Sequence, residues 1–262
     1  MKQGEYFSED NNASIQLIKK KQQSEESVKY WQSSLKNDIL VEQWINYKEK
    51  SLSFLISRSI KRTIDIIGSI IGLILFLPLI IIIALLIKLE SSGSVIFSQL
   101  RIGQNRRRNI NGNGHLHERR INDLKGKPFY IYKFRTMKNG VDKYATSPYN
   151  KTDIRLTKIG KIIRSMCLDE IPQLINVIKG DMSLVGPRPE MSFIVKNYGP
   201  VEELRLAVKP GLTGLWQLYG SRAKNIHENL QYDLEYIKRR SLMFDLKIIL
   251  KTIGFMLRYK NV

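Results

Sequence analysis

The stretch IIGSIIGLILFLPLIIIIALLI, residues 66–87, decides how this chain is built, because it holds no charged residue and consists mainly of isoleucine and leucine. A helix rises about 1.5 Å per residue, so this run is long enough to cross the hydrocarbon core of a bilayer. Pro78 lies inside the run. A proline within a helix removes one backbone hydrogen bond and crowds the preceding turn, so we expect a kink there.

Basic residues stand on both sides of the apolar run. Lys61 and Arg62 precede it, and Lys88 and Arg101 follow it. Basic flanks mark the cytoplasmic side of a membrane helix, so a straight span would place one basic flank outside. A helix that breaks at Pro78 and leaves through the leaflet it entered keeps both flanks inside. The residues favour this re-entrant path, and a single span stays open because spanning helices also tolerate proline.

The chain as a whole is strongly basic. Its 262 residues include 43 Lys and Arg against 24 Asp and Glu, a formal net charge of +19. Such an excess favours polyanionic partners, namely nucleic acid, anionic lipid headgroups or diphosphate substrates. Cys167 is the single cysteine, which excludes an intrachain disulfide, and we interpret it as a packing residue.

Three parts follow from this organisation. They are a polar N-terminal extension, 1–57, a membrane helix, 58–90, and a C-terminal domain, 91–262. The extension suits short surface helices and disorder equally well. In the third part, residues rich in β-formers predict strands at 95–97 and 129–132. Apolar periodicity predicts helices at 158–166, 171–178, 226–237 and 244–257. The predicted fold class is therefore α+β and mainly helical, with short strands.

Two adjacent carboxylates, Asp169 and Glu170, stand in the sequence LDEIPQ, residues 168–173. Asp is a favoured N-cap and Pro172 is tolerated in a first turn, so we predict a helix that begins near Asp169. Its N-terminus would favour bound phosphate and an ionised Asp169, and a divalent cation such as Mg²⁺ would relieve the repulsion between the two anions. The pair alone is better explained as an ordinary N-cap followed by a first-turn glutamate.

Nearby cations change that interpretation. In GPRP, residues 186–189, a proline on each side of Arg188 restricts the backbone and presents the guanidinium rigidly to phosphate oxygens. Lys133 and Arg135 are two residues apart, so both side chains point to one face of a strand. Together, the acid pair and these cations predict a site for a nucleotide diphosphate.

Five ordered blocks carry a resemblance to a known family. They are VIFSQLRIG (95–103), KPFYIYKFRTM (127–137), LDEIPQL (168–174), KGDMSLVGPRP (179–189) and VKPGLTGLWQ (208–217). With these blocks the chain resembles the bacterial sugar transferases, the monotopic phosphoglycosyl transferases that begin the assembly of surface glycans. The resemblance covers about three quarters of the chain.

The resemblance implies a re-entrant helix-break-helix in the bacterial inner (cytoplasmic) membrane, with the catalytic domain on the cytoplasmic face. It implies transfer of a sugar-1-phosphate from a UDP-sugar to a polyprenyl (undecaprenyl) phosphate, with release of UMP and with Mg²⁺ as cofactor. This is the first membrane step in making exopolysaccharide, capsule, O-antigen or glycoprotein glycans. The expected partners are the UDP-sugar, the polyprenyl phosphate and membrane lipid, not nucleic acid. A homodimer is left open, and so is the identity of the sugar.

The resemblance also assigns roles to single residues. The aspartate of the acid pair is the family's nucleophile and forms a covalent phosphosugar intermediate, a role that falls on Asp169. Glu170 would assist metal binding or the acceptor step, and both carboxylates would bind the metal. The side chains expected to bind phosphates, nucleotide or sugar are Lys133, Arg135, Arg164, Arg188, Gln217 and Arg222.

Three features depart from the family pattern. Leu77 precedes Pro78 where many members carry serine, the Arg-rich segment 109–125 looks like an insertion, and the polar extension matches neither the minimal nor the large members. The alternative function is a membrane-anchored basic module that binds nucleic acid or lipid without catalysis. It uses the positive charge but gives the acid pair and Arg188 no purpose. A degenerate, scaffolding member is disfavoured because the acid pair and the cation blocks are intact.

Overall fold

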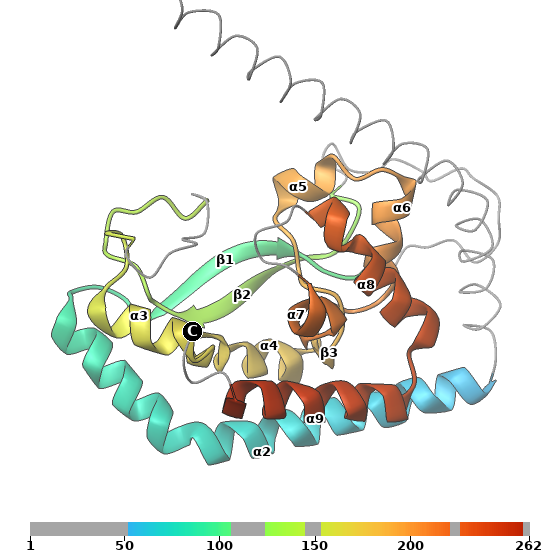
Figure 1. Ribbon diagram of the computed structural model, residues 1–262, viewed down its shortest axis with the longest axis horizontal. Helices are drawn as coiled ribbons and strands as arrows, with labels where there is room; N and C mark the ends of the chain where they lie inside the picture. The colour runs from blue at the N-terminus through green and yellow to red at the C-terminus, as the bar shows by residue number, and fades with distance from the viewer. Residues whose placement is uncertain (1–51, 106–123, 145–152, 221–225, 259–262) are drawn as a thin grey trace, which may run out of the picture. The chain divides into compact units, whose positions relative to one another are not determined.

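The computed structural model describes residues 52–105, 124–144, 153–220 and 226–258, whose elements carry the labels of Figure 1. The helices are α2 (Leu52–Glu90), α3 (Lys158–Ser165), α4 (Gln173–Lys179), α5 (Ser192–Lys196), α6 (Pro200–Glu203), α7 (Leu215–Tyr219), α8 (Ile226–Arg239) and α9 (Leu242–Arg258), with 3₁₀ turns η1 (Leu168–Glu170) and η2 (Leu204–Ala207). The strands are β1 (Ile96–Ile102), β2 (Pro128–Phe134), β3 (Ser183–Val185) and β4 (Gly211–Thr213). The mainly helical character and the short strands are confirmed for these residues.

The strands form two small pairs. β1 and β2 are antiparallel, with Ile96 opposite Phe134 and Ile102 opposite Pro128. β3 and β4 are parallel and very short. The predicted strands and the predicted helices are present, although β1 and β2 are longer than expected and α4 begins two residues late. Most of the extension 1–57, and the Arg-rich segment 109–125 apart from its last two residues, lie outside the described residues.

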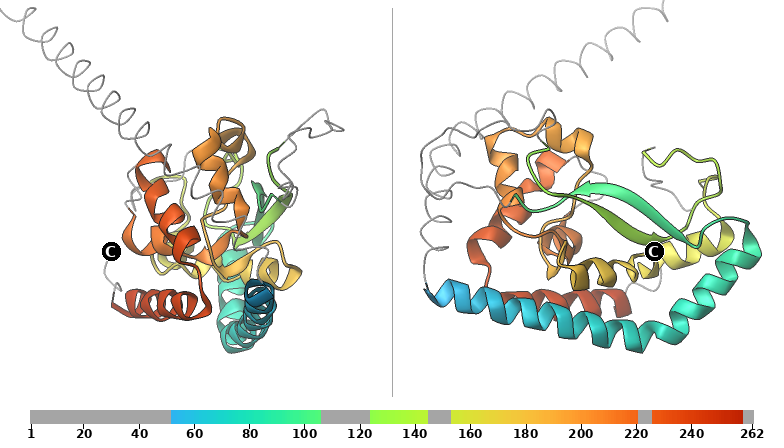
Figure 2. Two further views of the ribbon diagram at one scale, coloured as in Figure 1. Left: turned by 90° about the vertical axis from the view of Figure 1, so that its right-hand side faces the viewer. Right: turned by 180° about the vertical axis from the view of Figure 1, so that it is seen from behind.

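The long helix α2 contains the apolar run. The stretch Ile56–Glu90 is long and apolar enough to cross a membrane, and its most apolar part has a mean hydropathy of 3.4. Only 11% of that part is buried, whereas a core helix of a soluble protein is mostly buried. The helix passes through Pro78 without a break, and Figures 1 and 2 show it bent so that its C-terminal part turns toward α3. Pro78 therefore lies in one continuous, bent helix rather than between two helices.

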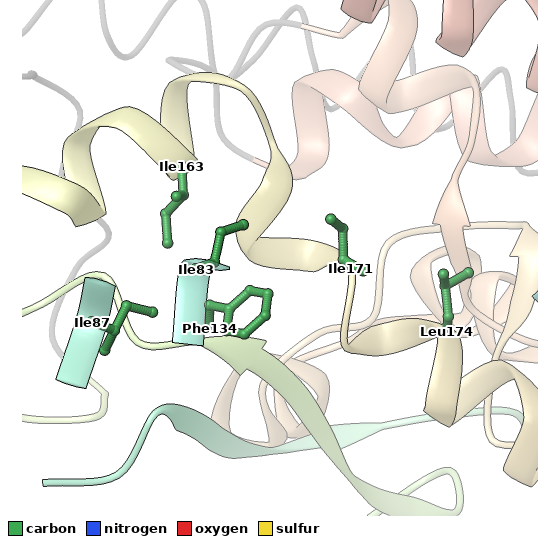
Figure 3. Packing of buried hydrophobic residues seen from close by; sticks show 6 residues of the cluster. All are labelled: Ile83, Ile87, Phe134, Ile163, Ile171 and Leu174. Atoms are coloured by element: carbon green, nitrogen blue, oxygen red, sulfur yellow. The ribbon is translucent and has the colours of Figure 1, made fainter. Parts of the chain in front are cut away.

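A hydrophobic cluster joins the second half of α2 to the following elements. Its six buried residues are Ile83, Ile87, Phe134, Ile163, Ile171 and Leu174 (Figure 3). They come from α2, β2, α3, α4 and the turn before α4, so α2 packs directly beside the segment that carries the acid pair. A second cluster, Phe129, Ile131, Val177 and Met182, packs β2 against α4 and the turn that follows it.

Polar contacts anchor α2 to the rest of the described chain on both sides of the apolar run. Before the run, Arg62 donates to the main-chain oxygens of Val177 and Ile178 at 2.6 and 2.7 Å, in the last turn of α4. Gly180 ends α4 with a φ of 84°, a conformation that favours glycine. At the other end, the Glu90 carboxylate accepts from the backbone nitrogens of Lys158 and Ile159, the first residues of α3.

A second set of contacts ties α2 to the C-terminal helix. Lys61 Nζ lies 2.6 Å from Asp245 Oδ2 on α9. Buried Asp65 accepts from Ser183 Oγ and Leu184 N at 3.1 and 3.0 Å. Figures 1 and 2 accordingly show α9 beside the first half of α2. Lys61 and Arg62, identified in the sequence as a basic membrane flank, thus make internal contacts.

Candidate active site

The acid pair lies on a 3₁₀ turn between α3 and α4. Asp169 and Glu170 belong to η1, and half-buried Cys167 just before it has a φ of 56°, which is uncommon for a residue other than glycine. α4 begins only at Gln173, so the prediction that Asp169 caps a helix is wrong. The left-handed conformation of Cys167 turns the chain after α3, and the 3₁₀ turn takes up the residues that were expected to open the helix.

Asp169 is buried in this turn, with 7% of its surface exposed. Burial raises the pKa of its carboxyl, the positive charge of Lys133 opposes that rise, and neighbouring Glu170 adds to it. The helix whose N-terminus was expected to favour the ionised carboxylate does not begin at Asp169, because α4 starts at Gln173. The cations around Asp169, rather than a helix end, are what favour its charged form.

Lys133 and Arg188 both reach the acid pair. Lys133 Nζ lies 2.5 Å from Glu170 Oε1 and 3.8 Å from Asp169 Oδ2. Arg188 Nη1 lies 3.7 Å from the same Glu170 oxygen, and its guanidinium carbon lies 5.4 Å from the centre of the Trp216 ring. The structure thus gathers two carboxylates and two cations from β2, η1 and the segment after β3. We call Asp169, Glu170, Lys133 and Arg188 the acid-pair cluster.

The backbone around Arg188 is held from several sides. Gly186 N donates to Thr213 O at 2.9 Å, and Gly211 N donates to Pro187 O at 2.8 Å. A Cβ on Gly211 would collide with the backbone nitrogen of Gly186, so the close approach of these two segments requires glycine at Gly211. Arg205 Nη2 also donates to the carbonyl oxygen of Arg188 at 3.2 Å. These contacts fit the rigid presentation of Arg188 that its flanking prolines predict.

The other residues predicted for the site have different positions. Arg164 on α3 is close enough that its charge lowers the pKa of Asp169. Gln217 follows Trp216 on α7, and its Oε1 is buried without a hydrogen-bond partner among the described residues. Arg222 lies outside the described residues.

Arg135 does not join the acid-pair cluster. Its guanidinium donates to the carbonyl oxygens of Ser91 and Ser92 and to Asn139, so it holds the turn that follows α2. The prediction that Arg135 and Lys133 share one face fails because β2 ends at Phe134. Arg135 is buried and its described contacts are structural.

The sequence interpretation missed one cation near the cluster. Arg101 on β1 is close enough to Arg188 and Glu170 for both charges to affect its pKa. The sequence analysis named it as a basic residue after the apolar run and as part of the block VIFSQLRIG, but gave it no role in the site. Its position depends on the register of β1 against β2, in which Arg101 faces Phe129 and Phe97 faces Lys133.

The carboxylates of the acid pair suit Mg²⁺ as a donor set. No group of three or more His, Cys, Asp or Glu side chains that could hold a metal occurs in the ranges that the structure describes. Mg²⁺ is commonly bound through one or two carboxylates together with water and substrate phosphates. Asp169 and Glu170 supply two such carboxylates, so they fit a metal that binds together with a phosphate substrate. Glu170 would then contact both the metal and Lys133.

Comparison with known proteins gives a consistent family. The model of the family described as bacterial sugar transferase matches residues 56–259. A UDP-N-acetylgalactosamine-undecaprenyl-phosphate N-acetylgalactosaminephosphotransferase of Aeromonas hydrophila is 38% identical over 200 residues, which cover 74% of this chain and 43% of that protein. The chain thus spans less than half the length of this relative.

Two further relatives are covered over more of their length. A UDP-glucose:undecaprenyl-phosphate glucose-1-phosphate transferase of Caulobacter vibrioides is 37% identical over 209 residues, covering 77% of this chain and 71% of that protein. The exopolysaccharide production protein ExoY of Sinorhizobium fredii is 33% identical over 208 residues, covering 74% and 83%. The matched region contains the acid-pair cluster and most of α2.

Proposed function

The chain belongs to the bacterial sugar transferase family, and on that premise we propose that it transfers a sugar-1-phosphate from a UDP-sugar to undecaprenyl phosphate and releases UMP. The acid-pair cluster is the observation that carries this proposal. A buried aspartate with Lys133 3.8 Å away, and with Arg188 beside the neighbouring Glu170, suits attack on a phosphorus whose oxygens the cations neutralise. The names of the relatives describe transfer between the same two substrate classes.

In the first step, an oxygen of the Asp169 carboxylate attacks the phosphorus that bears the sugar. The bond from that phosphorus to the UMP oxygen breaks, and UMP leaves with the electron pair. Lys133, 3.8 Å from Asp169, favours the ionised carboxylate that the attack needs and faces the charge on the phosphoryl oxygens. Bound Mg²⁺, held by Asp169 and Glu170, would supply further neutralisation of the diphosphate.

In the second step, a phosphate oxygen of undecaprenyl phosphate attacks the same phosphorus. The bond to Asp169 breaks, which regenerates the carboxylate and gives a polyprenyl diphosphate sugar. Glu170 contacts both Lys133 and Arg188, at 2.5 and 3.7 Å, so it orients the two cations in both steps. No proton has to be transferred, because both attacking groups are anions.

We further propose that α2 enters and leaves the cytoplasmic leaflet of the inner membrane, with the active site on the cytoplasmic face. Residues on both flanks of the apolar run contact the same domain, through Arg62 before it and Glu90 after it. These contacts support the proposal, because a straight span would place the two flanks on opposite sides of a hydrocarbon core of about 30 Å. The side of α2 away from the domain exposes apolar side chains such as Leu75 and Leu89, a surface that suits lipid.

The activity is tested by incubating purified membranes with a panel of UDP-sugars and measuring UMP. UDP-glucose and UDP-N-acetylgalactosamine come first, since the relatives named for these sugars match almost equally well. We expect sustained UMP release with one of the sugars, and only when undecaprenyl phosphate is present. Membranes with Asp169→Asn protein are the control. Failure of every UDP-sugar to yield acceptor-dependent UMP would refute the proposed function.

The membrane path is tested by single cysteines in place of Lys50 and Lys138 in a Cys167→Ser background. A membrane-impermeant thiol reagent is added to intact cells and to inverted membrane vesicles. The re-entrant path predicts labelling of both positions only in the vesicles. Labelling of position 50 in intact cells would show instead that α2 spans the membrane.

A further inference from the structure

Arg101 lies on the same face of the β1–β2 pair as Lys133. Residues that face each other across an antiparallel pair point to the same side, and side chains alternate along each strand. Phe97 faces Lys133 and Arg101 faces Phe129, so Phe97, Arg101 and Lys133 share one face. Arg101 therefore points to the side on which the acid-pair cluster is built.

The guanidinium of Arg101 binds only neutral acceptors in the described part of the chain. Nη2 donates to Gln99 Oε1 at 2.7 Å, and Nη1 donates to Pro189 O at 3.4 Å, next to Arg188. Its Nε is buried and has no hydrogen-bond partner among the described residues. Gln99 and Pro189 thus orient a cation whose charge has no carboxylate in ion-pair contact within those ranges.

The surroundings of Arg101 are unfavourable to its charge. Burial lowers its pKa to about 10, with a further contribution from the positive charge of Arg188, while Glu190 and Glu170 act in the opposite direction. A half-buried cation beside a second cation is costly unless an anion compensates both. The acid pair compensates Arg188 only in part, because Glu170 is 3.7 Å away and already binds Lys133.

We propose that Arg101 and Arg188 together bind a phosphate monoester beside the acid pair, which makes Arg101 a substrate-binding residue. This inference rests on the proposed function and deepens it. In a double displacement at one phosphorus, the leaving oxygen of UMP and the entering oxygen of the acceptor lipid occupy, in turn, the position opposite Asp169. The two guanidinium groups therefore hold the UMP phosphate as it leaves and the lipid phosphate as it enters.

The test compares Arg101→Gln, Arg101→Lys and the control Arg155→Gln in purified, detergent-solubilised protein. Arg155 is a suitable control because its ion pair is with Asp153, at 2.7 Å, and not with a member of the acid-pair cluster. Calorimetry measures the binding of UMP, inorganic phosphate and uridine. We expect Arg101→Gln to weaken the binding of UMP and of phosphate at least about tenfold, since the variant loses charge-assisted hydrogen bonds. The binding of uridine should be unchanged. Arg101→Lys should be intermediate, and Arg155→Gln should match wild type.

Steady-state kinetics with the same variants distinguish the two phosphates. A raised inhibition constant for UMP in Arg101→Gln identifies the leaving phosphate as a ligand, and a raised KM for undecaprenyl phosphate identifies the entering one. We expect both constants to rise. Thermal unfolding checks that each variant is folded, and Arg101→Lys carries the test if Arg101→Gln does not fold.

The inference and the proposed function fail in different ways. Wild-type binding of UMP and phosphate by a folded Arg101→Gln protein, with an unchanged acceptor KM, would overturn the role of Arg101 while the transferase reaction stood. If Arg101→Gln lost phosphate binding but the wild-type protein released no UMP from any UDP-sugar, the anion site would stand and the proposed reaction would fail.

Discussion

Two groups of charged residues in the described part of this protein differ in how completely their members are paired. In the first, which we call the Arg205 cluster, Arg205 Nε lies 2.7 Å from Asp233 Oδ2, and Arg205 Nη1 donates to the Tyr198 hydroxyl. Glu190 lies 3.9 Å from the same guanidinium. In the acid-pair cluster only Lys133 and Glu170 are that close, and its other ion pairs measure 3.7 and 3.8 Å.

This difference indicates that the charges of the Arg205 cluster stabilise the fold, whereas those of the acid-pair cluster are available to bind a ligand. The side chains of Arg205 and Asp233 are 5% and 3% exposed and compensate each other, so a ligand would have little to add. Arg188 is 34% exposed and incompletely paired. The two groups are also connected, because Arg205 donates to the carbonyl of Arg188. The Arg205 cluster therefore supports the backbone of Arg188, which belongs to the acid-pair cluster.

Removal of the nucleophile should abolish the activity of the acid-pair cluster without affecting the fold. Asp169→Asn keeps the shape of the side chain but replaces the attacking carboxylate with an amide. We expect UMP release to fall by about a thousandfold or more, with an unchanged unfolding temperature. UMP release at the wild-type rate would show that another group attacks the phosphorus.

Removal of the Asp233 carboxylate from the Arg205 cluster should instead lower the stability of the fold. Asp233→Asn removes the carboxylate nearest to the buried Arg205 charge and, among the described residues, leaves only Glu190, 3.9 Å away, so we expect a loss of about 3–5 kcal/mol in the free energy of unfolding. Denaturant unfolding of the purified protein measures it. Asp153→Asn is the matched control, because Asp153 pairs with Arg155 at a similar distance without comparable burial, and it should change stability little. Equal losses in the two variants would remove the contrast between the clusters.

Mg²⁺ should be needed for the activity of the acid-pair cluster and not for the stability of the fold. We expect chelation of divalent cations to stop UMP release and to leave the unfolding temperature unchanged, because Asp169 and Glu170, the proposed metal ligands, lie in the acid-pair cluster. Glu170→Gln should raise the Mg²⁺ concentration needed for half-maximal activity by about 10- to 100-fold. Full activity in excess chelator would exclude the proposed role of Mg²⁺.

A smaller effect should come from the anchor of α2. Arg62→Gln loses two hydrogen bonds from a charged group to carbonyls of α4, so we expect a loss of about 1–3 kcal/mol in the free energy of unfolding. Arg58→Gln, an exposed arginine on the same helix, is the control. If the two variants were equally stable, Arg62 would belong with solvated surface charges rather than with the structural ones.

Local patterns in the sequence were enough for the longer elements and for part of the site. β1, β2, α3, α4, α8 and α9 follow from residue preference and side-chain periodicity, whereas the short elements β3, β4, α5, α6 and α7 were not predicted. Pro187 and Pro189 already restrict the backbone at Arg188. Lys133 was assigned to the site from its strand and from the family resemblance, and it does contact Glu170. These features depend on neighbours in the chain, which sequence patterns record well.

The features that sequence patterns missed depend on contacts between distant segments. Cys167 adopts a left-handed conformation that no residue type signals, and this moved Asp169 out of a helix cap into a 3₁₀ turn. Arg135 lies outside the acid-pair cluster because its guanidinium donates to the carbonyl oxygens of Ser91 and Ser92, in the turn after α2. Arg101 was missed because its place beside Arg188 depends on strand register and on contacts with the segment after β3.

The most direct test of the proposed mechanism is mass spectrometry of the protein after incubation with its UDP-sugar and without acceptor lipid. The proposed mechanism predicts a sugar-phosphate adduct on the peptide that contains Asp169, and its disappearance when undecaprenyl phosphate is added. Turnover with no adduct, or with an adduct on a different residue, would contradict it.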